Sequence, residues 1–391
     1  MLPSPFILHT CERTQAANAC TRAQQRGFCL SEESQKPTIL VTGVSGNLGR
    51  RLLPFLGDFN VVGVDRVPVA GHPEIAVHPI NLGQESSCDE LVKLLRETRA
   101  EAVVHLAFVI DPLRTGVTDR DAMWQINVAG TARVMEAIAE VNRNGGHVGK
   151  FLYPSSVAVY GPETPPFVDE DAPHNAHTLN YAVQKAEADS VVRFRAAGMG
   201  ACSVYILRPH IFAGASVENY LVNAIRGRAF GNGKMAERMR RKNQRLPLLL
   251  PFGKQYPEKL FQFVHVDDVA RLFNWLLHRT PPAETPVELL VLNVAGSGEP
   301  ITLAACAEIA KAKLVRLPGR GLCAWVLQFL WDRGISSVPP DAFPYLSGSY
   351  TMTTARLQDL LGADYPKVIQ YSTEAALTDS FREQQAAVPT T

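Results

Sequence analysis

The sequence predicts an α/β fold, a doubly wound parallel sheet with a smaller C-terminal domain. Three observations indicate this class. Short apolar runs alternate with helical segments over the first half of the chain. A glycine-rich turn separates the first apolar run from the first helix. The regular alternation then loosens after Pro209, which indicates a second and less regular part.

The predicted strands are short apolar runs of the kind found in buried parallel sheets. The first, Thr38–Thr42, ends where Gly43 breaks the pattern. Further strands are expected at residues 61–64, 102–106, 150–153 and 202–207. Helices are expected from about Leu48, through residues 123–142, and from Tyr181. Strands that alternate with helices in this way form a parallel sheet with helices on both faces.

The second half of the chain carries more varied segments. They are a basic stretch at 237–245, expected to be a solvated helix face, a leucine run at 247–251, a helix at 267–277, a strand at 289–294, a helix at 302–313 and an apolar helix at 322–331. The expected organisation is a leader at 1–36, a first domain at 37–210 to which 264–295 returns, and a second domain formed by 211–263 and 296–391.

Composition excludes several classes of protein. Of the 391 residues, 46% are hydrophobic and 20% are charged, and the formal net charge is +1. This balance provides no broad basic field for nucleic acid or an anionic membrane. The 7 cysteines are scattered without CxxC spacing, which indicates free thiols in a reducing, cytoplasmic compartment and no metal site. No apolar stretch reaches the roughly 18 residues of a transmembrane helix.

The glycine-rich turn has the properties of a phosphate-binding loop. Gly43, Gly46 and Gly49 follow the spacing GxxGxxG between the first strand and the first helix. Gly43 permits a tight turn, Gly46 lets a pyrophosphate approach the backbone, and Gly49 lets the helix pack close to the sheet. Free N–H groups at the start of the helix would face the phosphates. The alternative is a packing turn without a ligand.

An acidic residue ends the second predicted strand, where the ribose of a bound dinucleotide is expected. The carboxylate of Asp65 can accept a hydrogen bond from a ribose 2′-hydroxyl and would repel a 2′-phosphate. The neighbouring Arg66 could pair with such a phosphate. The sequence therefore predicts a dinucleotide site that prefers NAD, with NADP as the less favoured cofactor.

A serine, a tyrosine and a lysine form a candidate proton-transfer site. Tyr181 and Lys185 lie one turn apart on one face of a predicted helix, and Ser156 follows a predicted strand. A free tyrosine has a pKa of about 10 and is a poor base at neutral pH. A nearby ammonium would favour the phenolate, and Ser156 can hold a substrate oxygen. The trio therefore suits hydride chemistry at a carbinol carbon.

Several short motifs occur in the order known from one family. They are TGVSGNLG at 42–49, HLA at 105–107, NVAGT at 127–131, SSVAVYG at 155–161, YAVQK at 181–185, RP at 208–209 and VHVDDVA at 264–270. On these motifs the chain resembles the extended short-chain dehydrogenase/reductases, and within them the NAD-dependent epimerase/dehydratases similar to UDP-glucose 4-epimerase. The likeness spans about residues 37–381 and is firm up to about 270.

The resemblance implies a role for each matching residue. Ser156, Tyr181 and Lys185 would be catalytic, with Asn127 as the structural member of a catalytic tetrad. The implied cofactor-binding residues are Gly43, Gly46, Asn47, Leu48, Gly49, Asp65, Arg66, Asn81, Leu82, Leu106, Ala107, Tyr181, Lys185 and Pro209. Asn81 departs from the acid that the family usually has. Packing or capping roles are expected for His105, His265, Asp267 and Asp268.

The residues that a sugar nucleotide would need match less well. Family epimerases have Arg-Tyr-Phe-Asn where this chain has Arg-Pro-His-Ile at 208–211, and an arginine where this chain has Leu-Phe-Gln-Phe at 260–263. A diphosphate needs cationic or N–H partners. The candidate cations are Arg226, Arg228, Lys234 and Arg245.

The resemblance implies an enzyme, an NAD-dependent epimerase/dehydratase that acts on a sugar nucleotide through a transient keto intermediate. A homodimer is the expected assembly. One alternative is a dehydrogenase or reductase of an apolar alcohol or ketone, similar to 3β-hydroxysteroid dehydrogenases. The missing diphosphate ligands and the apolar run at 322–331 favour it. The other alternative is a non-catalytic dinucleotide-sensing regulator, against which the presence of Tyr181 and Lys185 argues.

Overall fold

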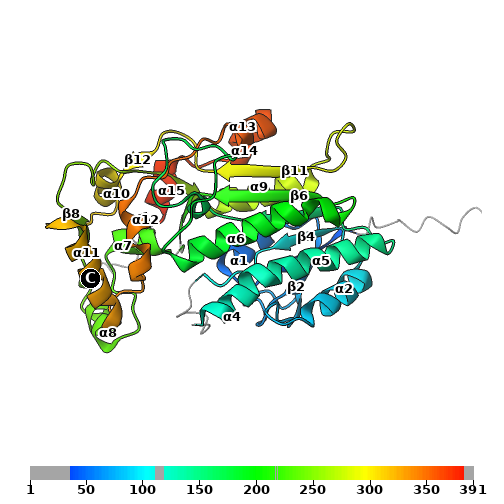
Figure 1. The fold of residues 1–391 in the computed structure, drawn as a ribbon, viewed down its shortest axis with the longest axis horizontal. Helices are drawn as coiled ribbons and strands as arrows, with labels where there is room; N and C mark the ends of the chain where they lie inside the picture. Colours follow the sequence, from blue (N-terminus) through cyan, green and yellow to red (C-terminus); the bar gives the residue numbers. More distant parts are fainter. Residues whose placement is uncertain (1–35, 111–118, 216, 218, 383–391) are drawn as a thin grey trace, which may run out of the picture. The chain divides into compact units, whose positions relative to one another are not determined.

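A seven-stranded sheet forms the centre of the protein. The computed structural model describes residues 36–110, 119–215, 217 and 219–382. The strands are β1 (Thr38–Thr42), β2 (Asn60–Val64), β3 (Ala76–His78), β4 (Ala102–His105), β5 (Lys150–Pro154), β6 (Ser203–Pro209) and β11 (Leu289–Val294). Their order is β11-β6-β5-β4-β1-β2-β3, and neighbours pair in parallel (Figure 1). All carboxyl ends therefore meet at one edge, and the strand order reverses between β1 and β4.

Helices cover both faces of this sheet. On one face lie α2 (Ser87–Thr98), α5 (Gly130–Arg143) and α6 (Asn180–Arg195), which Figure 1 shows together. The other face is covered by α1 (Asn47–Leu52) and α9 (Val266–His278). Leu52 of α1 and Phe273 of α9 are fully buried in the same apolar cluster. The predicted doubly wound Rossmann sheet is therefore confirmed.

The remaining elements are small two-stranded sheets and helices. The strands are β7 (Ile211–Ala213), β8 (Leu248–Pro251), β9 (Leu260–Phe261), β10 (Phe263–His265), β12 (Ile301–Thr302) and β13 (Leu314–Leu317). The helices are α7 (Tyr220–Arg226), α8 (Lys234–Arg241), α10 (Leu303–Ile309), α11 (Gly319–Asp332), α12 (Phe343–Ser347), α13 (Ala355–Leu361), α14 (Tyr365–Val368) and α15 (Thr373–Asp379). β7 pairs with β10, β9 with β12 and β8 with β13. Within the described residues, no helix combines the length and apolar character that a membrane crossing needs.

Two predicted helices differ from the observed ones. The helix expected at 123–142 is divided into α4 (Arg120–Trp124), a π-helical turn (Gln125–Ala129) and α5. The helix expected at 302–313 ends at Ile309, because Lys311 adopts a positive φ of 52° and the chain turns into β13. The predicted leader at 1–36, with its three cysteines, lies outside the described residues apart from Lys36.

A fully buried arginine ties β6 to the helix beside it. Arg208 donates hydrogen bonds to both carboxylate oxygens of Asp189 on α6, at 3.0 and 2.9 Å. It also donates to the Tyr160 hydroxyl at 2.8 Å and to the Glu170 carbonyl at 2.9 Å, and its last N–H group lies 2.9 Å from His174 Nε2. Burying a guanidinium without partners would cost free energy, and these contacts offset that cost.

We predict that Arg208→Leu lowers the free energy of unfolding by about 3–5 kcal/mol, because it leaves the Asp189 carboxylate buried without its cation. Urea unfolding followed by circular dichroism measures this loss. Lys93→Met is the control, since Lys93 forms only an exposed pair with Glu97, and little change is expected there. Equal unfolding midpoints for the two variants would contradict the structural role of Arg208.

Candidate active site

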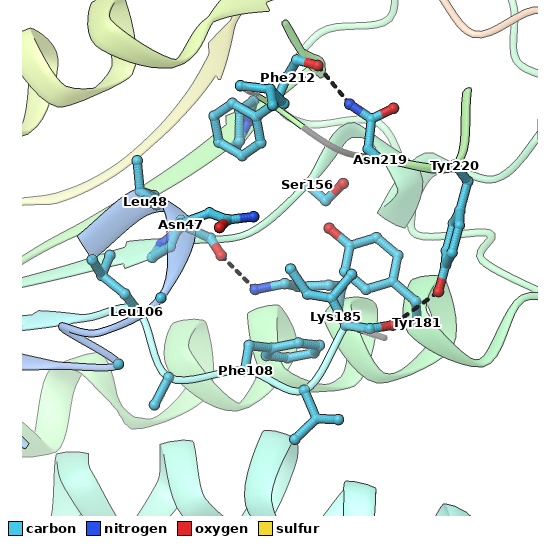
Figure 2. Close-up of a pocket in the computed structure, with 18 of the residues that line it drawn as sticks. Asn47, Leu48, Leu106, Phe108, Ser156, Tyr181, Lys185, Phe212, Asn219 and Tyr220 are labelled. Atoms are coloured by element: carbon cyan, nitrogen blue, oxygen red, sulfur yellow. Dashed lines mark hydrogen bonds between the residues drawn. The ribbon is translucent and has the colours of Figure 1, made fainter. Parts of the chain in front are cut away.

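A cavity of about 950 Å³ opens at the carboxyl ends of the central strands. Its walls come from the loops after β1, β2, β4, β5 and β6, and from segments around α7 and α12. Figure 2 shows part of this wall, with Asn47 and Leu48 on one side and Tyr181 and Tyr220 on the other. The cavity lies at the reversal of strand order, where ligands bind in doubly wound sheets.

The glycine-rich loop is held against the backbone of the neighbouring strand. Gly43 has a φ of +70°, and a Cβ there would lie 2.6 Å from the backbone nitrogen of Ala107. A Cβ on Gly49 would lie 2.3 Å from the Val44 carbonyl oxygen. A Cβ on Gly46, which lines the cavity, would lie 3.0 Å from the Gly43 carbonyl. At these glycine positions the backbone leaves little room for a side chain, and the loop backbone lies close to the cavity.

A carboxylate closes the β2 end of the same cavity. One oxygen of Asp65 accepts a hydrogen bond from the backbone N–H of Ser45 at 2.9 Å, and the other accepts from that of Arg66 at 2.7 Å. Asp65 is thereby fixed beside the glycine-rich loop. Ile80, Asn81, Leu82, Leu106 and Ala107 line the adjoining wall. A glycine cradle, an oriented carboxylate and a flat apolar wall fit the phosphates, ribose and adenine of a dinucleotide.

The serine, tyrosine and lysine meet at the other part of the cavity. Figure 2 shows the Tyr181 hydroxyl pointing toward Ser156, and the two side chains are hydrogen bonded. The Lys185 ammonium donates to the Pro154 carbonyl at 2.7 Å and lies 3.7 Å from the centre of the Phe108 ring. The structure therefore brings the three side chains together from the end of β5 and from α6.

Burial changes the acidity of both titratable members of this group. Burial raises the pKa of Tyr181, and the hydrogen bond from Ser156 partly offsets this change. Burial lowers the pKa of Lys185 to about 7, although the nearby Asp189 carboxylate raises it. The charge of Lys185 therefore changes around neutral pH, so its support of a Tyr181 phenolate depends on pH.

Asn127 lies behind the cavity wall rather than in it. Its carboxamide accepts a hydrogen bond from the Val109 backbone N–H at 2.6 Å and donates to the Val109 carbonyl at 3.0 Å. It also donates to the side chain of Gln184, the neighbour of Lys185, at 2.7 Å. Asn127 stands in the π-helical turn, a distortion often found at functional sites. It connects the wall after β4 to the helix that carries Tyr181 and Lys185.

The other predicted site residues divide clearly by position. The cavity is lined by Gly43, Gly46, Asn47, Leu48, Gly49, Asp65, Arg66, Asn81, Leu82, Leu106, Ala107, Ser156, Tyr181, Lys185 and Pro209. His105 is a core histidine between the hydroxyls of Thr42 and Thr131, and burial lowers its pKa to about 3. His265 caps α9, as predicted. No group of three metal-ligating side chains occurs among the described residues.

Part of the cavity wall was not identified from the sequence. The additional residues include Phe108, Ile110, His210, Ile211, Phe212, Asn219, Tyr220, Phe230, Tyr345, Leu346 and Tyr350. The Tyr220 hydroxyl donates to the Ile110 carbonyl at 3.0 Å, and the Asn219 amide donates to the Phe212 carbonyl at 2.6 Å (Figure 2). Most of these side chains are apolar and come from segments without a regular pattern, so the sequence offered no signal that identified them.

Few of the side chains that line the cavity are charged. Among its described lining residues, the charged side chains are Arg50, Asp65, Arg66 and Lys185. The four candidate diphosphate ligands, Arg226, Arg228, Lys234 and Arg245, are absent from that lining. Arg226 donates to the Ser380 carbonyl and Arg245 to that of Ala310. The additional residues named above, from Phe108 to Tyr350, include no lysine or arginine.

We predict that the thermal stability of the protein rises relative to that of Lys185→Met between about pH 7 and about pH 9. The pKa of Lys185 falls from 10.5, its ordinary value, to about 7 on folding. Between these limits the unfolded chain holds a proton that the folded chain has released, so the free energy of unfolding increases with pH. Thermal unfolding of both proteins across this range measures the difference, and parallel curves would contradict it.

Comparisons with known proteins give the same fold. D-erythronate dehydrogenase from Cupriavidus necator is 29% identical over 161 residues, which cover 38% of this chain and 47% of that protein. The chain thus spans about half the length of the curated relatives it matches. A structure of MoeE5 with UDP-glucuronic acid and NAD is 19% identical, with a TM-score of 0.59 over 90% of this chain and 100% of that one.

A second solved structure and a family model complete the comparison. The UDP-glucose 4-epimerase of Thermus thermophilus, in complex with NAD, is 18% identical with a TM-score of 0.60, over 90% of this chain and 100% of that chain. The model of the NAD dependent epimerase/dehydratase family matches residues 39–293, well over half of the 391 residues. The chain belongs to the NAD-dependent epimerase/dehydratase family.

Proposed function

We propose that this protein is an NAD-dependent oxidoreductase that acts at a carbinol or carbonyl carbon. The observation that carries the proposal is one continuous cavity. It has the glycine cradle and Asp65 in one part, and Ser156, Tyr181 and Lys185 in the other. A cofactor that extends between these parts would bring its reactive ring to the only described tyrosine–lysine pair of the wall. Membership of the family supports the same chemistry.

The residues of the glycine-rich loop, among them Gly46 and Asn47 of the cavity lining, would hold the cofactor phosphates through backbone N–H groups. Asp65 would accept hydrogen bonds from the adenosine ribose, which favours NAD over NADP. Leu82 and Leu106 offer an apolar surface for the rings. When bound, the nicotinamide supplies a hydride acceptor or donor at the Tyr181 part of the cavity.

Side chains of the protein would carry out the proton transfers. Tyr181 would take the proton of a substrate hydroxyl during oxidation and return it during reduction. Ser156, already hydrogen bonded to Tyr181, would hold the substrate oxygen in reach of that hydroxyl. Lys185 in its charged form would stabilise the phenolate, and the positive charge of a bound oxidised cofactor would add to this effect. Asn127 would position the helix and the wall without touching the substrate.

An apolar alcohol or ketone is the substrate class that the cavity supports best. Around Tyr181 the described wall consists mainly of aromatic and aliphatic side chains, including Phe108, Phe212 and Tyr345. The sequence-predicted cations lie elsewhere. Burying a diphosphate without cationic partners would be costly, whereas an apolar skeleton gains from leaving water. This lining supports a net dehydrogenase or reductase.

A sugar nucleotide is the second candidate. Solved structures of similar fold hold UDP-glucuronic acid or UDP-glucose together with NAD. Asn219, Asn223 and Asn232 also line the cavity and could donate hydrogen bonds to a nucleotide. In that case Tyr181 would serve an epimerisation through a transient keto intermediate, without net consumption of added cofactor.

Substrate class is tested by following nicotinamide absorbance and fluorescence with the full chain. Steady formation of NADH from NAD and a hydrophobic secondary alcohol, with no response to UDP-sugars, is the expected result. Reduction of tightly held NAD by a UDP-sugar, without turnover of added cofactor, would instead establish the epimerase candidate. Absence of NADH binding under both conditions would contradict the proposal as a whole.

We predict that Tyr181→Phe lowers kcat by roughly 10²–10⁴-fold, because it removes the group that exchanges the substrate proton. NADH affinity, measured by fluorescence titration, should stay within a few-fold of the wild-type value. Tyr153→Phe is a matched control, since this buried tyrosine belongs to the sheet core and is absent from the described cavity wall. Full activity in Tyr181→Phe would contradict the assignment of proton transfer to Tyr181.

A further inference from the structure

Helix α11 is apolar on two faces. Cys323, Leu327 and Leu330 line a smaller cavity on the side toward the body of the protein. On the other side, Leu322, Trp325 and Phe329 recur at helical spacing and are 39%, 62% and 39% exposed. The rings of Trp325 and Phe329 stack with their centres 5.9 Å apart. A row of large apolar side chains therefore faces solvent along the helix.

Two further exposed hydrophobic side chains border this row. Phe252, 58% exposed, donates its backbone N–H to the carbonyl of Leu317 just before α11 begins. Met235, 57% exposed, lies in α8, whose start is joined to the end of α11 by a hydrogen bond from the Gly233 N–H to the Gly334 carbonyl. Figure 1 shows α8 and α11 side by side. We call Met235, Phe252, Leu322, Trp325 and Phe329 the α11 face.

Basic side chains border the α11 face. They include the exposed Lys234 and Arg238 of α8 and the exposed Lys242 directly after it. None of the three has an acidic partner among the described residues. The Arg333 guanidinium lies 4.8 Å from the centre of the Phe329 ring. Although the whole chain has a net charge of only +1, this region carries a local excess of positive charge. The α11 face and its border therefore form a patch that is both apolar and basic, although the net charge of the whole chain is small.

We propose that the α11 face docks on the surface of an anionic lipid membrane. Tryptophan, phenylalanine and leucine side chains enter the boundary between headgroups and acyl chains, and flanking lysines and arginines attract anionic headgroups. Since no described helix can cross a bilayer, α11 would lie in the plane of the interface. The combination of apolar row and basic border selects an anionic lipid surface over a neutral one.

The docking face also lies close to the proposed substrate cavity. The small cavity beneath α11 shares Asn223, Phe230, Ser337 and Leu346 with the wall of the main cavity. An apolar alcohol dissolved in the membrane would thus have its entry beside the docked helix. This access route rests on the proposed function, whereas docking itself depends only on the α11 face and its basic border.

Flotation of the full chain with lipid vesicles tests the proposal. The vesicles contain phosphatidylcholine alone, or equal parts of phosphatidylcholine and phosphatidylglycerol. Binding is expected to the anionic vesicles and to decrease with added salt. The double variant Trp325→Ser, Phe329→Ser should reduce vesicle partitioning about tenfold or more. Phe194→Ser is the matched control, because Phe194 is 88% exposed on α6, away from the α11 face.

Charge is tested separately with Lys234→Glu, Arg238→Glu, which should weaken binding to anionic vesicles, and with Arg193→Glu on α6 as the control. Thermal unfolding of each variant establishes that it is folded. Failure of the wild-type protein to float, or an equal loss in the control variants, would overturn the proposal. The proposal would also be overturned if the double variant formed a smaller assembly in solution than the wild-type protein while its flotation did not change. The α11 face would then be a contact between copies of the chain. NADH binding is measured on the same samples. Loss of vesicle binding with NADH binding retained would be a failure of membrane docking alone, and not of the proposed function.

Discussion

The parallel pairing of β1, β4, β5 and β6 is the constraint on which the other features depend. It sends the loops after these strands to one edge of the sheet. The reversal of order beside β1 leaves a gap there, and the backbone of the glycine-rich loop passes within contact distance of Ala107. That edge brings together the glycine-rich loop, an oriented Asp65 and a serine, tyrosine and lysine in the same cavity.

Polar groups buried behind this edge determine how the site behaves. Asp189 lies one helical turn after Lys185. Its carboxylate accepts a hydrogen bond from Arg208, and its charge raises the pKa of Lys185. Because Arg208 uses its donors within the core, it is unavailable to a substrate. Burial lowers the pKa of Lys185, so burying this group costs stability at neutral pH. The site and the core are therefore coupled through α6.

Local patterns were enough to predict the sheet and the part of the cavity lined by the glycine-rich loop and Asp65. Thr38–Thr42 and Leu289–Val294 were predicted with the bounds that the structure gives, since apolar runs report burial directly. The substrate part was beyond reach, because Phe212, Tyr220 and Tyr345 meet through tertiary packing of irregular segments. β3 was overlooked because it is only 3 residues long and partly exposed. α2 was also overlooked, although its leucines follow a helical pattern. No pattern could indicate that Asn127 faces the wall's backbone instead of the cavity.

The central claim is that a nicotinamide dinucleotide lies along the cavity from Asp65 to Tyr181. A crystal structure of the full chain with NADH tests it most directly. The account predicts density with the adenosine ribose at the Asp65 carboxylate, the phosphates at Gly46 and the nicotinamide beside the Tyr181 hydroxyl. A dinucleotide bound in the opposite direction, or at a place where its nicotinamide is remote from Tyr181, would contradict it.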